Sequence, residues 1–206
     1  MGTCIDIPLL YSTLLYSPFE IRHNKMLSRL LSIIYLAKQK IDRILLQGFI
    51  KSKLPKGSPM PIIKSKVFWN ATNVKVGKKV TLYPGVYLWG RNIEFGDNVN
   101  IGMNTVIFAK KGVTIGNNTN IAGQCYIIDT NHGTKAGRLI REQEDDVAEN
   151  GIFIGNDVWI AAQCVILKGA KINDGAVIGA QSLVNCEIPA NAIAVGTPAK
   201  VIGYRK

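Results

Sequence analysis

Aliphatic residues recur at every sixth position between residues 151 and 195. The openers of these six-residue steps are Ile154, Ile160, Ile166, Ile172, Ile178 and Val184. The fourth position after each opener is small or modest in size, with Ile188 as the exception: Val158, Cys164, Ala170, Ala176 and Ser182. The third position after the opener is polar or glycine: Asp157, Gln163, Gly169, Gly175 and Gln181. A period of six fits neither a flat strand, which repeats every 2 residues, nor a helix, which repeats every 3.6.

A repeat of six residues predicts a parallel β-helix, in which three steps wind into one coil of a three-sided prism. The opener and the small residue point into the prism, and the small one lies near a corner, where space is short. The residue between them turns the corner. Glycine, asparagine and aspartate suit that place because they tolerate a left-handed backbone. Successive coils are expected to stack about 4.8 Å apart through backbone hydrogen bonds.

The same rhythm extends towards the N-terminus with two interruptions. The earlier openers are Val76, Leu82, Leu88, Phe95, Ile101, Ile107, Ile115, Ile121 and Ile127. A slip occurs at residues 90–92, and two extra residues, Lys111 and Gly112, shift the register again. Asn98, Asn104 and Asn118 occupy predicted corners. We therefore predict about five coils and assign residues 62–206 to the β-helix domain.

Two segments of this domain leave the repeat. Residues 129–150 read DTNHGTKAGRLIREQEDDVAEN, which is too polar for the prism interior and too long for a simple connection. A stretch of this kind is typical of a functional loop that projects from a rigid framework. Residues 189–206 follow the last coil, and we expect them to cap the open end of the prism.

Residues 1–61 show a different pattern. A helical period runs over residues 24–47, with apolar residues near one face and most basic residues off it, and Gly48 is expected to end the helix. Residues 51–61 are expected to be a linker. A basic amphipathic helix suits either a membrane surface or packing on the β-helix or a neighbouring subunit. We favour packing, the commoner use of an apolar stripe.

Charge is concentrated in this N-terminal part. The net charge of the chain is +11, and residues 1–66 hold eleven lysines and arginines against three acidic residues. Such a segment suits phosphate, nucleic acid or an anionic membrane. We expect no nucleic-acid partner, but a peripheral contact of residues 20–56 with an anionic membrane. The sequence has no secretory signal pattern and no uncharged run of bilayer length, so we expect a cytoplasmic protein, associated with the inner membrane face, whose four cysteines are reduced.

One of the two histidines, His132, follows the point where the chain leaves a rigid coil. A group that exchanges protons near neutral pH is most simply a histidine. Asp129 precedes it by three residues and is a candidate partner for the ring, as is a backbone carbonyl. We expect His132 to be catalytic, and His23, just before the basic helix, to be incidental.

The run IGNDVWIAAQCVILKGAKINDGAVIGAQSLV and the tail IPANAIAVGTPAKVI resemble the hexapeptide-repeat acyltransferases. The resemblance covers about residues 70–205 and is nearest to the maltose and galactoside O-acetyltransferases and to bacterial polysaccharide O-acetyltransferases. It implies a left-handed parallel β-helix, hence an all-β fold with an N-terminal α-helical extension. It also implies a homotrimer, with acetyl-CoA as co-substrate in the groove between neighbouring prisms.

The resemblance implies roles for residues at matching positions. His132 matches the general base and Trp159 the tryptophan of the acyl-donor site. Ala161 and Ala162 match residues whose backbone borders the thioester, where an N–H would stabilise the oxyanion. Ala180 and Ser182 match the next coil along the pantetheine arm. The tail residues Thr197 and Lys200 match the nucleotide end, where Lys200 or Arg205 would pair with phosphate.

The implied reaction is direct acetyl transfer to a sugar hydroxyl in polysaccharide or glycan synthesis, without an acyl-enzyme. No serine or cysteine has a visible histidine partner that would activate it. Asn131, Arg141 and Gln143 share the loop with His132 and are expected to face the acceptor, as is Arg138, although solvated loop polarity explains the arginines and Gln143 equally well. No metal is expected.

Three alternatives are considered. A zinc enzyme of the γ-carbonic anhydrase type needs three histidines at each site, which one loop histidine does not supply. A non-catalytic β-helix scaffold would need neither His132 nor Trp159. An N-acetyltransferase acting on an amino sugar or nucleotide sugar would use the same residues, so the choice between amine and hydroxyl stays open.

Overall fold

The computed structural model describes residues 25–206, with side chains from residue 27 on. The expectations for His23 and for the rest of residues 1–24 lie outside this part. The described chain divides into two compact units, with the boundary in the sequence between Leu46 and Gln47.

A single long helix, α2 (Lys25–Lys53), confirms the predicted helical period but ends later than predicted. Gly48 lies inside the helix and does not stop it. Ile50 belongs to the second unit and its side chain is fully buried, so the last turns are retained by packing. The helix ends just before Leu54, because Pro55 disfavours helical geometry at the residue that precedes it. The linker predicted over residues 51–61 therefore begins three residues later.

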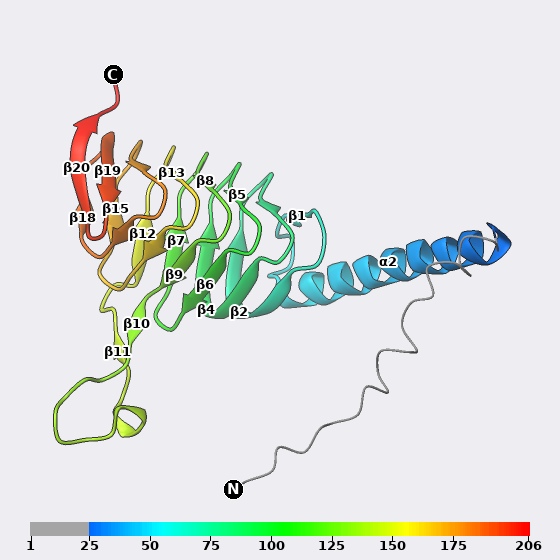
Figure 1. The fold of residues 1–206 in the computed structure, drawn as a ribbon, viewed down its shortest axis with the longest axis horizontal. Coiled ribbons are helices and arrows are strands. Elements are labelled where there is room, and N and C mark those ends of the chain that lie inside the picture. Colours follow the sequence, from blue (N-terminus) through cyan, green and yellow to red (C-terminus); the bar gives the residue numbers. More distant parts are fainter. Residues whose placement is uncertain (1–24) are drawn as a thin grey trace, which may run out of the picture. The chain divides into compact units, whose positions relative to one another are not determined.

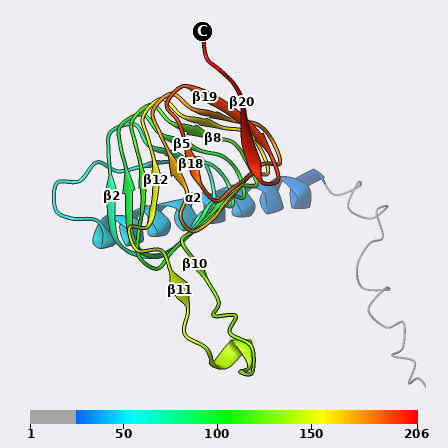
Figure 2. The same ribbon diagram turned by 90° about the vertical axis from the view of Figure 1, so that its left-hand side faces the viewer.

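The second unit is a parallel β-helix with three faces (Figures 1 and 2), which confirms the predicted fold class. The first face consists of β1 (Ile62–Ile63), β3 (Thr81–Leu82), β5 (Asn100–Ile101), β8 (Asn120–Ile121), β13 (Trp159–Ile160), β16 (Val177–Ile178) and β19 (Ala192–Gly196). The second face carries β6 (Val106–Ala109), β9 (Tyr126–Ile128), β14 (Val165–Ile166) and β17 (Leu183–Val184). The third carries β7 (Val113–Ile115), β12 (Ile152–Ile154), β15 (Lys171–Ile172) and β18 (Glu187–Ile188).

Two long strands, β2 (Phe68–Val76) and β4 (Tyr87–Phe95), run through both the second and the third face. The slip at residues 90–92 lies inside β4, where Gly90 and Asn92 have φ of 99° and 55° and turn the chain without ending the strand. β1 and the first half of β2 place Ile63 and Trp69 inside the prism before Val76, the first predicted opener, so the prism begins earlier than its sequence pattern indicates.

The predicted register of the hexads is confirmed at the inward and corner positions. The openers from Ile154 to Val184 are 0% exposed, and the small residues that follow them, including Cys164 and Ser182, are buried. Each fully buried aliphatic side chain stabilises the prism by about 1.5–3 kcal/mol. The predicted corner residues all have positive φ: Asn98, Asn104, Asn118, Asp157, Gln163, Gly169, Gly175 and Gln181.

Polar side chains at the corners stack along the prism axis. Gln163 donates to Gln124 at 3.0 Å, and Gln181 donates to Gln163 at 3.1 Å. Along another corner, the Asp174 carboxylate accepts the backbone N–H of Asn156 at 2.7 Å, which lowers the pKa of that carboxyl group. These ladders link corner to corner between coils and add to the stiffness of the framework.

Residues 129–150 leave the prism, as predicted, but they do not form an irregular loop throughout. The root is a short antiparallel hairpin of β10 (Thr130–Asn131) and β11 (Asp146–Val147), and a 3₁₀ turn spans Ile140–Glu142. Figure 1 shows this segment projecting away from the coils. At the C-terminus, β20 (Ala199–Tyr204) pairs antiparallel with β19 after a cis Thr197–Pro198 bond and follows the last coil, as expected of a cap.

Candidate active site

The position of His132 follows from the register of the hairpin at the root of the projecting segment. Thr130 pairs with Val147, and Asn131 pairs with Asp146. One further step along this register sets His132 opposite Asp145, and cross-strand neighbours of this kind have their side chains in reach of each other. The hairpin therefore brings together two residues that are thirteen positions apart in the sequence.

The His132 ring lies against this carboxylate on one side and is open on the other. Its Nδ1 is 3.3 Å from Oδ1 of Asp145, while 75% of the His132 side chain is exposed. The other carboxylate oxygen of Asp145 forms an ion pair with Nζ of Lys110, and the Asp145 side chain is only 22% exposed. An acid whose charge is balanced by a lysine therefore faces Nδ1, and Nε2 is the ring nitrogen left for proton exchange.

Asp129, expected as the partner of His132, has a different role in the structure. Its side chain is fully buried and accepts the backbone N–H groups of Lys110, Lys111 and Gly112 at 2.7–2.8 Å. These are the residues around the two-residue insertion, whose backbone leaves the regular ladder. Asp129 therefore stabilises the displaced corner, and Asp145 is the carboxylate that faces the imidazole.

Gln143, expected to face an acceptor, instead organises the loop. Its Oε1 accepts the N–H of Lys135 at 2.8 Å, and its Nε2 donates to the carbonyls of Lys135 and Arg138. Arg141 and Asn131 are exposed. Gly133 packs closely on the returning chain, since an added Cβ would lie 2.8 Å from Gln143 Cβ. The residue next to His132 is thus held in place by contacts within the loop.

The residues expected to meet the acyl donor lie elsewhere, around the corner that follows the first face. Trp159 is 54% exposed on β13. The N–H of Ala161 donates to the Ile178 carbonyl at 2.9 Å and belongs to the inter-coil ladder, so it is not available for an oxyanion. Within residues 25–206, the N–H of Ala162 donates no hydrogen bond. Of the two alanines, only Ala162 has an N–H that is open to a ligand.

The remaining donor-side residues divide in the same way between exposed and interior positions. Ala180 occupies the place of Ala162 one coil later and is exposed. Ser182 is 1% exposed and its Oγ accepts the N–H of Gly196 at 3.0 Å, so its side chain stabilises the tail and does not face a ligand. Thr197 donates to the Gln181 carbonyl at 3.2 Å, which fixes the tail over this corner. Lys200 is exposed.

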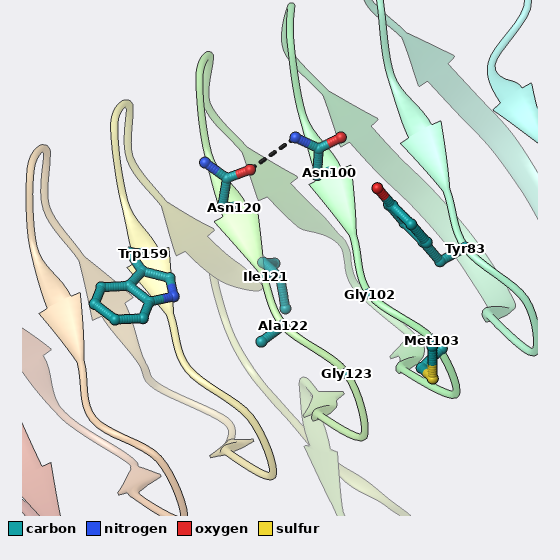
Figure 3. Close-up of a pocket in the computed structure, with 9 residues that line it drawn as sticks. All are labelled: Tyr83, Asn100, Gly102, Met103, Asn120, Ile121, Ala122, Gly123 and Trp159. Carbon is teal, nitrogen blue, oxygen red and sulfur yellow. Dashed lines mark hydrogen bonds between the residues drawn. The ribbon is translucent and has the colours of Figure 1, made fainter. Parts of the chain in front are cut away.

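Trp159 also borders a shallow hollow on the first face (Figure 3). Tyr83 lies towards its other end, and Asn100 donates to Asn120 at 2.7 Å between them. The rest of the lining comes from two stacked coils, at β5 and β8 and the corners that follow them: Gly102, Met103, Ile121, Ala122 and Gly123. An aromatic ring beside planar amides and apolar surface suits a partly apolar ligand.

The candidate residues therefore form two groups on different corners of one prism. Trp159, Ala162 and Ala180 surround the corner between the first and second faces, whereas the His132 hairpin leaves from the corner between the second and third faces. The structure assembles each group but does not bring the two together within one copy.

The three-sided prism of hexapeptide coils defines the class of fold, a parallel β-helix. The profile described as bacterial transferase hexapeptide (six repeats) matches residues 151–186. WbbJ of Escherichia coli strain K12, a putative lipopolysaccharide biosynthesis O-acetyl transferase, is 33% identical over 142 residues, which cover 65% of this chain and 72% of WbbJ. This chain belongs to the hexapeptide-repeat acetyltransferases.

Further relatives agree with this assignment. The galactoside O-acetyltransferase of E. coli strain K12 is 37% identical over 128 residues, covering 62% of each chain. A hexapeptide-repeat acetyltransferase of Vibrio cholerae, complexed with acetyl-CoA, has a TM-score of 0.58 at 29% identity and covers 63% of this chain and 70% of its own. The N-acyltransferase AntD of Bacillus cereus, with a TM-score of 0.66 at 19% identity over 78% of this chain and 88% of its own, shows the fold alone.

Sequence reasoning missed Asp145 and Lys110. The signal that was available is the run of three adjacent acids at residues 144–146, followed by a return to the hexads at residue 152. In residues 25–206, no cluster of three His, Cys, Asp or Glu side chains is arranged to hold a metal ion.

Proposed function

We propose that this acetyltransferase moves an acetyl group from acetyl-CoA to a hydroxyl group of a sugar in polysaccharide or glycan synthesis. The observation that carries the proposal is the exposed imidazole of His132, set on a hairpin with Asp145 behind it. The names of the relatives support the acceptor class, because WbbJ and galactoside O-acetyltransferase are both named for transfer to oxygen.

In the proposed reaction, Nε2 of His132 removes the proton of the acceptor hydroxyl while that oxygen attacks the thioester carbonyl. The N–H of Ala162 stabilises the negative charge that develops on the carbonyl oxygen. The attack forms a C–O bond between the acceptor and the acetyl carbon, and the C–S bond of the thioester then breaks. The imidazole gives its proton to the departing CoA thiolate. Trp159, Ala180 and Lys200 are proposed to hold the donor, Lys200 through phosphate.

The separation of the two residue groups supports a homotrimer in which neighbouring copies share each site. One copy would supply the hairpin with His132, and the next would supply the corner with Trp159 and Ala162. The loop residues Asn131 and Arg141 remain candidates for acceptor contact, because their side chains are exposed beside His132.

The decisive variant is His132→Ala. Loss of a general base lowers turnover by about 10²-fold or more, whereas CoA binding and assembly should be retained because the donor corner is untouched. Acetyl-CoA consumption over a panel of sugars, nucleotide sugars and amino sugars gives turnover, and CoA titration gives affinity. Unchanged turnover would refute the role of His132. If the unchanged protein prefers amino sugars, N-transfer replaces O-transfer as its reaction. If the unchanged protein is inactive and binds no CoA, a non-catalytic scaffold is favoured.

We further propose a cytoplasmic enzyme that contacts the inner membrane face through the basic segment, residues 20–56. In the described part of this segment, helix α2 has basic residues along its length and only one acidic residue, Asp42. Anionic lipid attracts each nearby basic side chain by about 1 kcal/mol. No helix within residues 25–206 has both the length and the apolar character needed to cross a bilayer.

A further inference from the structure

We propose that Asp145 is a positioning residue for the reaction, which holds the His132 ring with Nε2 turned to the acceptor. The inference rests on the proposed role of His132 as the base. Asp145 is joined to the prism through Lys110, so that a charge on the rigid coil, and not only the loop itself, sets the position of the ring.

The geometry of the pair favours one tautomer of the His132 ring. His132 and Asp145 are cross-strand neighbours, and the ring nitrogen Nδ1 lies 3.3 Å from the carboxylate. A negatively charged carboxylate beside this nitrogen favours the tautomer with the proton on Nδ1, because the N–H then faces the negative charge and the Nε2 lone pair does not. Nε2 then carries the lone pair needed by a general base.

Asp145 is in turn held in place by the prism. Its second oxygen pairs with Lys110, and the side chain is largely shielded from solvent. Lys110 stands on the same corner as the hairpin root, one coil earlier, and its backbone N–H donates to the buried carboxylate of Asp129 at 2.7 Å. A chain of contacts therefore runs from the buried Asp129 through Lys110 and Asp145 to His132.

The neighbouring acid, Asp146, secures the other side of the hairpin. Asp146 pairs with Lys168, which stands on the same corner one coil later. Two consecutive acids thus tie the hairpin to the coils before and after it. Only the first of them also faces the imidazole, so the two residues provide a matched pair of variants.

The test uses the full chain with ¹⁵N-labelled histidine, at about pH 8, where an ordinary imidazole is neutral. The two histidines are assigned by comparison with His132→Ala. We expect His132 to hold its proton on Nδ1 in the unchanged protein and in Asp146→Ala, and to shift towards the Nε2–H tautomer in Asp145→Ala. Asp145→Asn retains an acceptor oxygen and should restore part of the Nδ1–H population.

Turnover is measured on the same proteins. We expect Asp145→Ala to lower kcat by about 10- to 100-fold, the usual scale for loss of an orienting partner, with little change in KM. An unaltered tautomer and kcat in Asp145→Ala would overturn the proposal, as would an equal tautomer shift in Asp146→Ala. An altered tautomer with unaltered kcat would instead refute His132 as the base, so the two failures are distinguishable.

Discussion

A carboxylate that is saturated by backbone N–H groups is not available to a neighbouring side chain, and this separates Asp129 from Asp145. Both acids are near His132, one along the chain and one across the hairpin. Asp129 is turned inwards and accepts three N–H groups of the displaced corner. Without it these part-buried donors would lose their partner, and an unpaired donor that water does not reach costs about 1–3 kcal/mol. The hydrogen-bond requirement of the insertion therefore determines which acid is left for the histidine.

The Ala162 N–H can be removed with little effect on the fold. Pro84 occupies the same place in an earlier coil, two residues after an opener, and the preceding Tyr83 keeps its ladder hydrogen bond to Ile101 at 3.0 Å. We expect Ala162→Pro to fold normally and to lower kcat by about 10²–10³-fold, the usual cost of removing an oxyanion donor. Steady-state kinetics and thermal unfolding would measure the two effects.

The control for this variant is Ala162→Gly, which keeps the N–H and should keep kcat within a few-fold. Normal turnover of Ala162→Pro would show that another donor stabilises the oxyanion. A large loss of thermal stability in that variant would show that the precedent of Pro84 does not extend to this coil.

At the scale of elements, the sequence predicted those parts in which one physical constraint repeats. Every coil must bury an aliphatic residue and turn a corner, so openers such as Ile160 and corner residues such as Gln163 could be assigned from spacing alone. The hairpin of β10 and β11 has no such repetition, since each strand has only two residues and their alternation is too short to detect. His132 was found from its residue type, and Asp145 was missed because its role depends on pairing across the loop.

Helix α2 shows the opposite error, in which a local signal was given too much weight. Glycine inside a helix costs about 1 kcal/mol relative to alanine, which makes Gly48 a plausible end. Burial of Ile50 in the second unit offsets that cost, and the helix continues until Pro55 imposes an end. Burial of this kind is decided by tertiary packing, which the helical period alone does not contain.

The charge on this helix leads to a prediction about lipid binding. The full chain should bind vesicles of anionic lipid at low salt and be released as ionic strength rises, because exposed charges are screened over about 10 Å at 0.1 M. Co-sedimentation would measure it, with neutral vesicles as the control. Replacing Lys40 and Arg43 by glutamine should weaken binding, whereas the same change at Lys75 and Lys78 on the prism should not. Absence of binding to anionic vesicles at low salt would refute the membrane contact.

At the scale of the whole molecule, the important fact is that the histidine and the donor corner lie on different edges of one prism. A rigid β-helix has little freedom to bring two of its corners together, since its coils are tied by backbone ladders and buried aliphatic residues. In a ring of identical copies, one corner of each copy faces a different corner of the next. A shared site is therefore the simplest way to combine the two groups.

Mixed oligomers test this arrangement directly. Suppose that His132→Ala and Ala162→Pro chains are co-expressed in equal amounts. A shared site is then intact wherever an Ala162→Pro chain supplies the histidine and a His132→Ala chain supplies the corner with Ala162. Random assembly then restores about one quarter of the sites, although each variant alone is nearly inactive. Wild-type chains mixed equally with the double variant should likewise keep about one quarter of the sites, against one half if each site lies within one copy. Activity per chain in the mixtures decides between the two, and no recovery in the first mixture would assign the whole site to a single chain.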